Sequence, residues 1–327
     1  MKLLTISTDR KIFEKGSAVA LRQIEYAKGY EEVHIIVFTD KSFSETTLGL
    51  NIWVYPTRSS SKWKYVFDAL KLGRFITEKR GITDVTCQDP FETGLVGALV
   101  KSRHPVKLEL QIHTDLGSVN FQRFSFLNRI RMLISKFTLG KADKVRVVSK
   151  RIRDYVAMRI DPSKIEVRPI FVDVEKIKST PVTVNFHQKY PQFSKIVLMA
   201  SRLELEKNIP LAIQGFKLVL KKVPQAGLVI VGSGSEEGKL KALVKVLGME
   251  NSVIFEGWQN DLASYYKTSD CFLVTSLYEG YGMTFVEANA VGCKIVSVDV
   301  GIAREVGARI VGFDPREISA GLLEMIS

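Results

Sequence analysis

Short apolar runs alternate with helix-length segments along almost the whole chain. The runs are rich in Val, Ile and Leu, and each is long enough for one buried strand. In order they are KLLTIS, VHIIVF, NIWVYP, DVTCQ, VKLELQIH and KVRVVS, followed by KIVLMAS, GLVIVG, SVIFEG, CFLVTS and KIVSVDV. The segments between the earlier runs predict helices over 17–28, 61–80, 91–102, 121–138 and 150–159. Strands that alternate with helices predict parallel sheets covered by helices on both faces.

The apolar runs form two series, separated by a stretch in which the periodicity fades. This stretch, 171–194, gathers prolines and polar residues. We place the domain boundary near Thr180, which divides the chain into 1–178 and 179–327. The prediction is an α/β protein of two doubly wound, Rossmann-like domains facing a cleft. Ligands of such domains bind beyond the carboxyl ends of the strands.

The length of 327 residues fits two domains, and 46% apolar with 25% charged residues is ordinary for a globular protein with real cores. No stretch reaches the roughly 20 apolar residues that span a bilayer. The start, MKLLTISTDRK, is too short an apolar run for a secretory signal and predicts a first strand. Cys87, Cys271 and Cys293 lie far apart in or beside apolar segments. We expect free thiols without a metal site, in a reducing, cytoplasmic location.

The net charge of +12 is concentrated in one segment. Residues 121–159 carry 11 basic and 2 acidic side chains. Such a patch attracts phosphates, whether on an anionic membrane surface, a nucleic acid or a phosphorylated substrate. A solvated face without a partner is the alternative. We expect no nucleic acid, because no aromatic-rich motif or reading helix accompanies the charge.

Within this segment the predicted helix is imperfectly amphipathic. Arg129 and Lys136 lie opposite an apolar face, and Arg131 interrupts its edge. The apolar face is formed by Phe124, Leu127, Ile130, Ile134 and Phe137. One interpretation is a core helix with a solvated basic face. The other is docking on the inner face of an anionic membrane, which would suit a lipid-linked acceptor.

The candidate chemistry is concentrated in residues 271–301, CFLVTSLYEGYGMTFVEANAVGCKIVSVDVG. A strand ends near Thr275 and a helix begins near Gly282, so that Glu279 opens a glycine-containing turn between them. The helix N-terminus presents unpaired N–H groups that suit a phosphate. Glu287 follows inside the helix, and its carboxylate could accept hydrogen bonds from vicinal hydroxyls. Taken alone, both glutamates could be surface charges.

A second loop supplies cations. Arg202 and Lys207 lie between a strand and a helix that starts near Asn208, where they could clamp a diphosphate and stabilise a leaving group. A solvated basic loop is the alternative. Gly232 and Gly234 form a glycine turn after the next strand, which suits close approach to a nucleotide but is common.

Together these pieces resemble the retaining glycosyltransferases of the family 4 type, which have the GT-B fold. Four elements of the family have counterparts here in the same chain order. The arginine–lysine pair matches Arg202 and Lys207, and the glycine turn matches Gly232 and Gly234. The E-x7-E element matches Glu279 and Glu287, and a later glutamate matches Glu305. The resemblance covers roughly residues 195–312 well and the N-terminal half more loosely.

The resemblance implies a role for each of these residues. Arg202 and Lys207 would bind the donor diphosphate, Glu287 would hold the ribose hydroxyls, and Glu279 would contact the transferred sugar. Backbone N–H groups facing the sugar and phosphate would come from Gly280, Tyr281, Gly282, Met283 and Thr284. The donor would be a UDP- or GDP-linked sugar, and neither a cofactor nor a metal would be needed.

In the N-terminal half, Gly16 matches the family's glycine loop after the first strand, although Ser17 replaces the usual second glycine. His113 sits where the family often carries a histidine near the sugar. From the residues alone, a structural histidine is the alternative. The family also continues past Ser327 with helices that cross back to the first domain, so this chain is either a short member or truncated.

The resulting prediction is a retaining hexosyltransferase that uses a nucleotide diphosphate sugar and acts on a glycan, a glycolipid or another acceptor. The alternatives are a GT-B-fold sugar-nucleotide epimerase, a sugar phosphorylase and a non-catalytic nucleotide-sugar-binding subunit.

Overall fold

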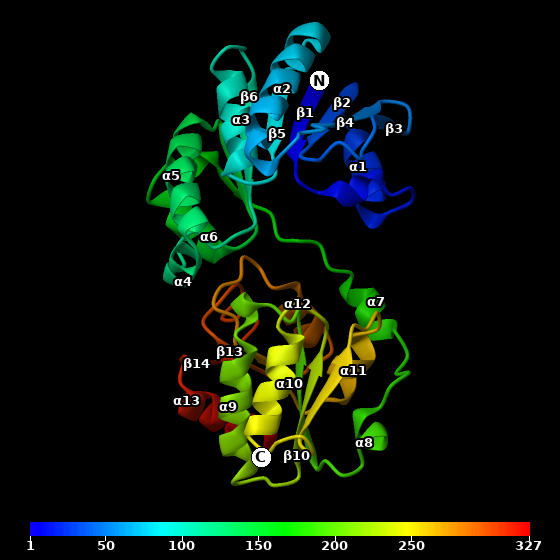
Figure 1. The fold of residues 1–327 in the computed structure, drawn as a ribbon, viewed down its shortest axis with the longest axis vertical. Coiled ribbons are helices and arrows are strands. Elements are labelled where there is room, and N and C mark those ends of the chain that lie inside the picture. The colour runs from blue at the N-terminus through cyan, green and yellow to red at the C-terminus, as the bar shows by residue number, and fades with distance from the viewer. The chain divides into compact units, whose positions relative to one another are not determined.

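The computed structural model describes residues 1–327, which form two compact units, Met1–Arg168 and Pro169–Ser327 (Figure 1). The division falls earlier in the chain than residue 178. Helix α7 (Val174–Ser179) packs against α12 (Met283–Ala290) of the second unit. The ammonium group of Lys267 also donates to the carbonyl oxygens of Lys178 at 2.8 Å and Thr180 at 2.5 Å. The segment that looked like a linker is therefore part of the second unit.

The first unit contains an eight-stranded sheet in the order β3-β4-β2-β1-β5-β6-β7-β8. Its strands are β1 (Lys2–Ser7), β2 (Glu32–Val37), β3 (Thr46–Leu48), β4 (Ile52–Pro56), β5 (Asp84–Cys87), β6 (Lys107–Ile112), β7 (Lys144–Val147) and β8 (Ile165–Val167). All neighbouring strands are parallel except β3 and β4. The predicted parallel sheet is confirmed. Strands β3 and β8 were not predicted, because three-residue strands give no readable apolar run.

Helices cover this sheet unequally. They are α1 (Ala18–Ala27), α2 (Tyr65–Arg80), α3 (Glu92–Lys101), α4 (Val119–Phe124), α5 (Phe126–Lys141) and α6 (Lys150–Ala157), with short 3-10 helices at Arg10–Phe13, Lys62–Lys64 and Pro162–Lys164. Helix α3 packs against both α2 and α5 in one layer, visible in Figure 1. The single helix predicted over 121–138 is two helices. The backbone of Ser125 is extended, and its hydroxyl caps α5 by accepting from the amide of Asn128.

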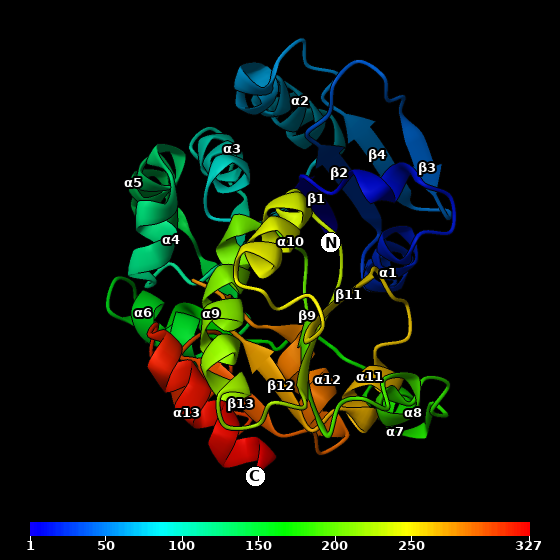
Figure 2. The ribbon, with the colours of Figure 1, turned by 60° about the horizontal axis from the view of Figure 1, so that its bottom comes forward.

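The second unit contains a six-stranded, fully parallel sheet in the order β11-β10-β9-β12-β13-β14. Its strands are β9 (Lys195–Ala200), β10 (Ala226–Val231), β11 (Val253–Gly257), β12 (Cys271–Val274), β13 (Ile295–Val298) and β14 (Arg309–Val311). Besides α7 and α12, its helices are α8 (Phe186–Lys189), α9 (Ile209–Leu220), α10 (Glu237–Val246), α11 (Ala263–Thr268) and α13 (Pro315–Ile326), with a 3-10 helix at Leu205–Lys207. Helix α9 packs against α10 and α13, and α11 packs against α12 (Figure 2).

The strand order of the second unit locates a switch point. The chain builds β9, β10 and β11 outward in one direction and then returns to place β12 on the other side of β9. The loops that leave β9 and β12 therefore diverge at neighbouring strand ends. In doubly wound sheets a ligand crevice forms at this point, beyond the carboxyl ends of the strands.

Cys87 and Cys271 are buried, Cys293 is half-buried, and all three are free thiols in this structure. None of the helices combines the length and apolar character needed to span a membrane.

Candidate active site

The loops after β9 and β12 are bonded to each other at the switch point. The hydroxyl of Thr275, just past the end of β12, lies 3.1 Å from the carbonyl oxygens of both Lys207 and Asn208. The amide of Leu277 donates to the carbonyl of Glu206 at 2.8 Å. These contacts hold the end of the cation-bearing loop against the start of the glutamate-bearing turn.

Lys207 and Glu279 meet at this junction. The ammonium nitrogen of Lys207 lies 2.5 Å from Oε1 of Glu279, and the hydroxyl of Ser276 donates to the same oxygen at 2.8 Å. Their side chains are 14% and 19% exposed. Arg202 is different: it is 64% exposed and pairs with Glu206 of its own loop. An exposed ion pair of this kind contributes little to stability, so Arg202 can turn toward a ligand at little cost.

Gly232 and Gly234 have a packing role in this structure. A Cβ on Gly232, whose φ is +137°, would lie 1.9 Å from the carbonyl oxygen of Ser201. A Cβ on Gly234 would lie 2.3 Å from the carbonyl oxygen of Leu203. The loop after β10 thus packs directly on the backbone of the loop that carries Arg202. From the sequence we attributed these glycines to the close approach of a nucleotide. The structure shows that they permit the close approach of a neighbouring loop.

The glycine turn leads directly into α12. Gly282 has a φ of +84° and is the N-cap, and no side chain caps the helix. The first N–H groups of a helix have no partner within it, so those of Met283 and Thr284 are placed to receive an anion. The loop after β13 contacts this turn, because the amide of Ile302 donates to the carbonyl of Tyr281 at 3.1 Å.

Gly301 is a residue that sequence reasoning missed. Its φ is +51°, and a Cβ there would lie 2.4 Å from the carbonyl oxygen of Tyr281. The signal available was a glycine three residues after the end of strand β13, in the run GIAREVG. The exposed Glu305 lies in the same turn, and its charge adds to burial in raising the pKa of Tyr281.

Glu287 points toward a pocket of about 320 Å³ in the second unit. Oε2 of Glu287 accepts a hydrogen bond from the hydroxyl of Tyr266 at 3.0 Å. Burial raises the pKa of Glu287, and the hydrogen bond from Tyr266 opposes that rise. The other pocket residues come from the α7 segment (residues 174–180) and from the loop before α11 with the first residue of that helix. They are Lys176, Ile177, Thr180, Asn260, Asp261, Leu262 and Ala263. The sequence indicated neither Tyr266 nor the α7 segment as part of a site.

Of the candidates in the first unit, Gly16 lies between the 3-10 helix at Arg10–Phe13 and α1, and His113 lies at a strand end. Gly16 has a φ of +76° and precedes Ser17, whose hydroxyl caps α1 by accepting from the amide of Ala20. His113 directly follows β6, and its Nε2 is 3.4 Å from the side-chain oxygen of Gln111. The surrounding protein and then the charges of Arg146 and Arg22 lower the pKa of His113 to about 4, although part of its surface remains exposed. The direction of this shift favours the uncharged imidazole at neutral pH.

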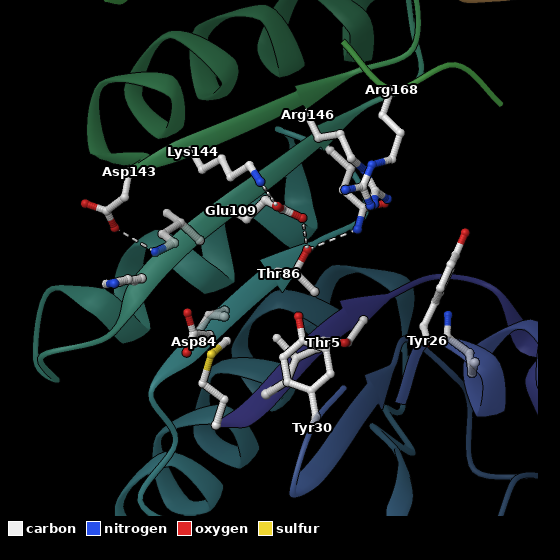
Figure 3. Close-up of a pocket in the computed structure, with 17 residues that line it drawn as sticks. Thr5, Tyr26, Tyr30, Asp84, Thr86, Glu109, Asp143, Lys144, Arg146 and Arg168 are labelled. Carbon is white, nitrogen blue, oxygen red and sulfur yellow. Dashed lines mark hydrogen bonds and ion pairs between the residues drawn. The ribbon is translucent and has the colours of Figure 1, made fainter. Parts of the chain in front are cut away.

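A larger pocket, of about 640 Å³, lies on the open sheet face of the first unit beside α1 (Figure 3). Several of its polar groups bond to one another or to a residue beside the pocket. Glu109 accepts from Thr86 at 3.1 Å, Gln111 donates to Thr86 at 3.0 Å, and Lys144 pairs with Glu166 at 2.6 Å. Because these groups already have partners, the pocket gives no indication of a particular ligand.

Helix α5 packs on α3 with a mixed polar and apolar buried side. The side chains that it buries include polar ones: Asn128 donates to the carbonyl of Phe121 at 2.8 Å, and Thr138 donates to that of Pro90 at 2.6 Å. Met132 and Leu139 are also buried, and Ile134 is half-buried, but five large apolar side chains are exposed, namely Phe126 (75%), Leu127 (44%), Ile130 (40%), Leu133 (66%) and Phe137 (46%). The helix thus has a buried side and a partly apolar exposed side, so the core-helix interpretation and lipid docking both stay predictions.

Comparison with known proteins identifies the two halves separately. The model for Glycosyltransferase Family 4 matches residues 25–176, and the model for Glycosyl transferases group 1 matches residues 185–311. HepE of Anabaena, solved in complex with UDP and with UDP-glucose, aligns over 99% of this chain and 89% of its own, with 18% identity and a TM-score of 0.73. This likeness shows the GT-B fold.

Two curated relatives differ in how far they align. Mannosylfructose-phosphate synthase of Agrobacterium fabrum is 34% identical over 36% of this chain and 29% of its own length. Alpha-monoglucosyldiacylglycerol synthase of Streptococcus pneumoniae is 26% identical over 86% of this chain and 67% of its own. The alignments with the first curated relatives span less than half of those proteins' lengths.

Proposed function

Because this chain belongs to the family 4, group 1 glycosyltransferases, we propose that it transfers a hexose from a nucleoside diphosphate sugar to an acceptor hydroxyl, with retention of configuration. The observation that carries this proposal is the pairing of Lys207 with Glu279 at the switch point of the second sheet. A cation, a carboxylate and an uncapped helix N-terminus converge there, which is the set that a sugar joined to a diphosphate requires.

The cations act on the diphosphate. Lys207 exchanges part of its bond with Glu279 for a phosphate oxygen, and Arg202 turns from Glu206 to a second one. Their positive charges stabilise the leaving diphosphate as it gains negative charge. The N–H groups from Gly280 to Thr284 complete the cradle. Glu279, released in part from Lys207, accepts hydrogen bonds from the hydroxyls of the transferred hexose.

Glu287 and the first unit complete the assignment. Glu287 accepts hydrogen bonds from the ribose hydroxyls, and the loop at Gly16 adds backbone N–H groups near the phosphate. His113 is neutral, so it can face the anomeric carbon without adding charge to a centre that becomes positive. The expected acceptor domain (1–178) and donor domain (179–327) correspond to the units Met1–Arg168 and Pro169–Ser327, so that residues 169–178 go to the donor unit.

UDP-linked sugars are the first donors to test, because UDP and UDP-glucose are the ligands named for HepE. The experiment is a thermal-shift and hydrolysis screen against UDP- and GDP-linked hexoses. A donor that raises the melting temperature and slowly releases free hexose supports a transferase. An epimerase would return an isomerised nucleotide sugar, a phosphorylase would require phosphate, and a non-catalytic subunit would bind a donor without turnover.

The acceptor is lipid-linked or lies at a membrane surface, where the protein sits peripherally on the cytoplasmic face. The proposal of a membrane-located acceptor rests on the exposed apolar side of α5, which is flanked by the exposed Arg129 and Lys136. A relative that aligns over most of the chain is named for synthesis of a glycolipid. The protein should cosediment with vesicles containing phosphatidylglycerol and not with phosphatidylcholine vesicles. Absence of binding at low salt would contradict the membrane assignment.

A further inference from the structure

We propose that Tyr266 is a positioning residue of the donor site: its hydroxyl fixes one oxygen of Glu287 so that the other oxygen is presented to the vicinal hydroxyls of the donor's ribose. This inference rests on the proposed function, since it concerns how Glu287 would bind a nucleotide.

Core packing fixes the ring of Tyr266, and the ring in turn fixes where its hydroxyl donates. Tyr266 is 1% exposed, and its ring packs edge-on against Phe272 with a centroid distance of 5.2 Å. The ring is therefore held in place by the core of the second unit. Its hydroxyl donates to Oε2 of Glu287 at 3.0 Å. A carboxylate held at one oxygen by a rigid donor has lost most of its rotational freedom before the ligand arrives.

Polar residues line the pocket around Glu287, among them Thr180 and Asn260. Lys176 from the α7 segment and Asp261 from the loop before α11 are the other charged residues that line the pocket. Burial raises the pKa of Glu287, and the bond from Tyr266 pulls it back toward the usual range. Because the ionised carboxylate is the form that accepts two hydroxyl donors, the phenol also favours the form that binds.

The neighbouring tyrosine provides a matched control. Tyr265 lies in the same helix and is 2% exposed, but its hydroxyl faces Glu256 at 3.4 Å and not Glu287. Tyr265→Phe thus removes a buried hydroxyl from α11 without touching the carboxylate that would bind the ribose. Any effect that arises only from loosening α11 should appear in both variants.

The test measures binding of UDP and GDP, and of their 2′,3′-dideoxy counterparts, by titration calorimetry on the full chain from pH 5 to pH 8. Tyr266→Phe should weaken binding of the ribonucleotide about tenfold, the loss expected for one hydrogen bond to a charged group. It should scarcely change binding of the dideoxynucleotide. The acid limb, which is the fall of ribonucleotide affinity at low pH, should move to higher pH than in the wild type, since Glu287 loses the donor that lowers its pKa. Tyr265→Phe should match the wild type in both respects.

Three results would overturn the inference. Equal losses for the two kinds of nucleotide, an unmoved acid limb, or the same changes in Tyr265→Phe would each assign Tyr266 a structural role only. A wild-type protein that binds neither UDP nor GDP would overturn the proposed function itself, and this inference with it.

A second variant keeps the test decisive should Tyr266→Phe not fold. Glu287→Gln keeps the shape of the side chain but cannot titrate. In both proteins, binding weakens at low pH as the nucleotide's own phosphate is protonated. In the wild type, protonation of Glu287 adds a further loss of affinity, which Glu287→Gln should lack. An unchanged acid limb in Glu287→Gln would overturn the inference.

Discussion

The ammonium group of Lys207 and the carboxylate of Glu279, which lie 72 positions apart in the chain, form a largely buried ion pair at the ends of two neighbouring strands. The pair neutralises the centre of the candidate site while no ligand is bound. A diphosphate must therefore compete with Glu279 for the ammonium group. The contribution of Lys207 to the binding free energy is the difference between its interaction with the diphosphate and its interaction with Glu279.

Replacing Lys207 should weaken nucleotide binding. Lys207→Ala removes one charged hydrogen bond to the diphosphate, which costs about 1.5–3 kcal/mol. The measurement is titration calorimetry with UDP and GDP. Lys217→Ala, at an exposed position on α9, is the control and should leave the affinity unchanged. If Lys207→Ala binds nucleotide as the wild type does, Lys207 does not belong to the donor site.

Gly232→Ala should destabilise the second unit. The added Cβ would overlap the carbonyl oxygen of Ser201, and the φ of +137° is barely open to other residues. We expect a loss of about 2–4 kcal/mol in the free energy of unfolding, measured in urea. Gly238→Ala in α10 is the control, because no atom lies within 4 Å of its Cβ position. It should gain about 0.5–1 kcal/mol from helix propensity. Equal effects would mean that loop packing does not require Gly232.

The α7 segment should be needed for a stable second unit. A fragment 169–327 should melt cooperatively and at a higher temperature than a fragment 179–327. The shorter fragment lacks the packing of α7 on α12 and the carbonyl of Lys178 that accepts from Lys267. Circular dichroism melts of the two fragments provide the comparison. Identical melting temperatures would show that the unit begins after α7.

Charge on the exposed side of α5 should abolish vesicle binding. Leu133→Asp places a carboxylate where a 66% exposed leucine would enter the interface. Cosedimentation with phosphatidylglycerol vesicles should fall at least tenfold, because burying an ionised carboxylate in that layer is costly. Val246→Asp, at an 83% exposed apolar position in the second unit, should bind as the wild type does. Equal retention of binding by both variants would remove α5 from the contact.

The sequence predicted the long elements and missed the short ones. Apolar runs such as KIVLMAS located β9 because a strand buried on both faces is apolar throughout. A three-residue edge strand such as β14 carries no such pattern. The break at Ser125 had a signal, a serine before a helical run, but the apolar periodicity continues across it and hid the capping site.

The candidate site was predictable where it depended on residue type and chain order. Lys207 and Glu279 were chosen from separate loops, and the structure brings them into contact. Tyr266 was not predictable, because a buried tyrosine before an apolar strand looks like any other core residue. Its role depends on the direction of a single hydroxyl, which tertiary packing sets. The same holds for α5, whose outward side is decided by the helices beside it.

The contacts of Thr275 bear on how fast a ligand is taken up. Its hydroxyl lies against the carbonyl oxygens of Lys207 and Asn208, so the cation and the carboxylate are held in one rigid piece before any ligand arrives. Capture by this pair of loops should therefore follow single-exponential kinetics, with an observed rate that rises linearly with nucleotide concentration. Loosening the contact with Thr275→Val should introduce a slow phase that saturates, because the pair would then have to assemble around the ligand.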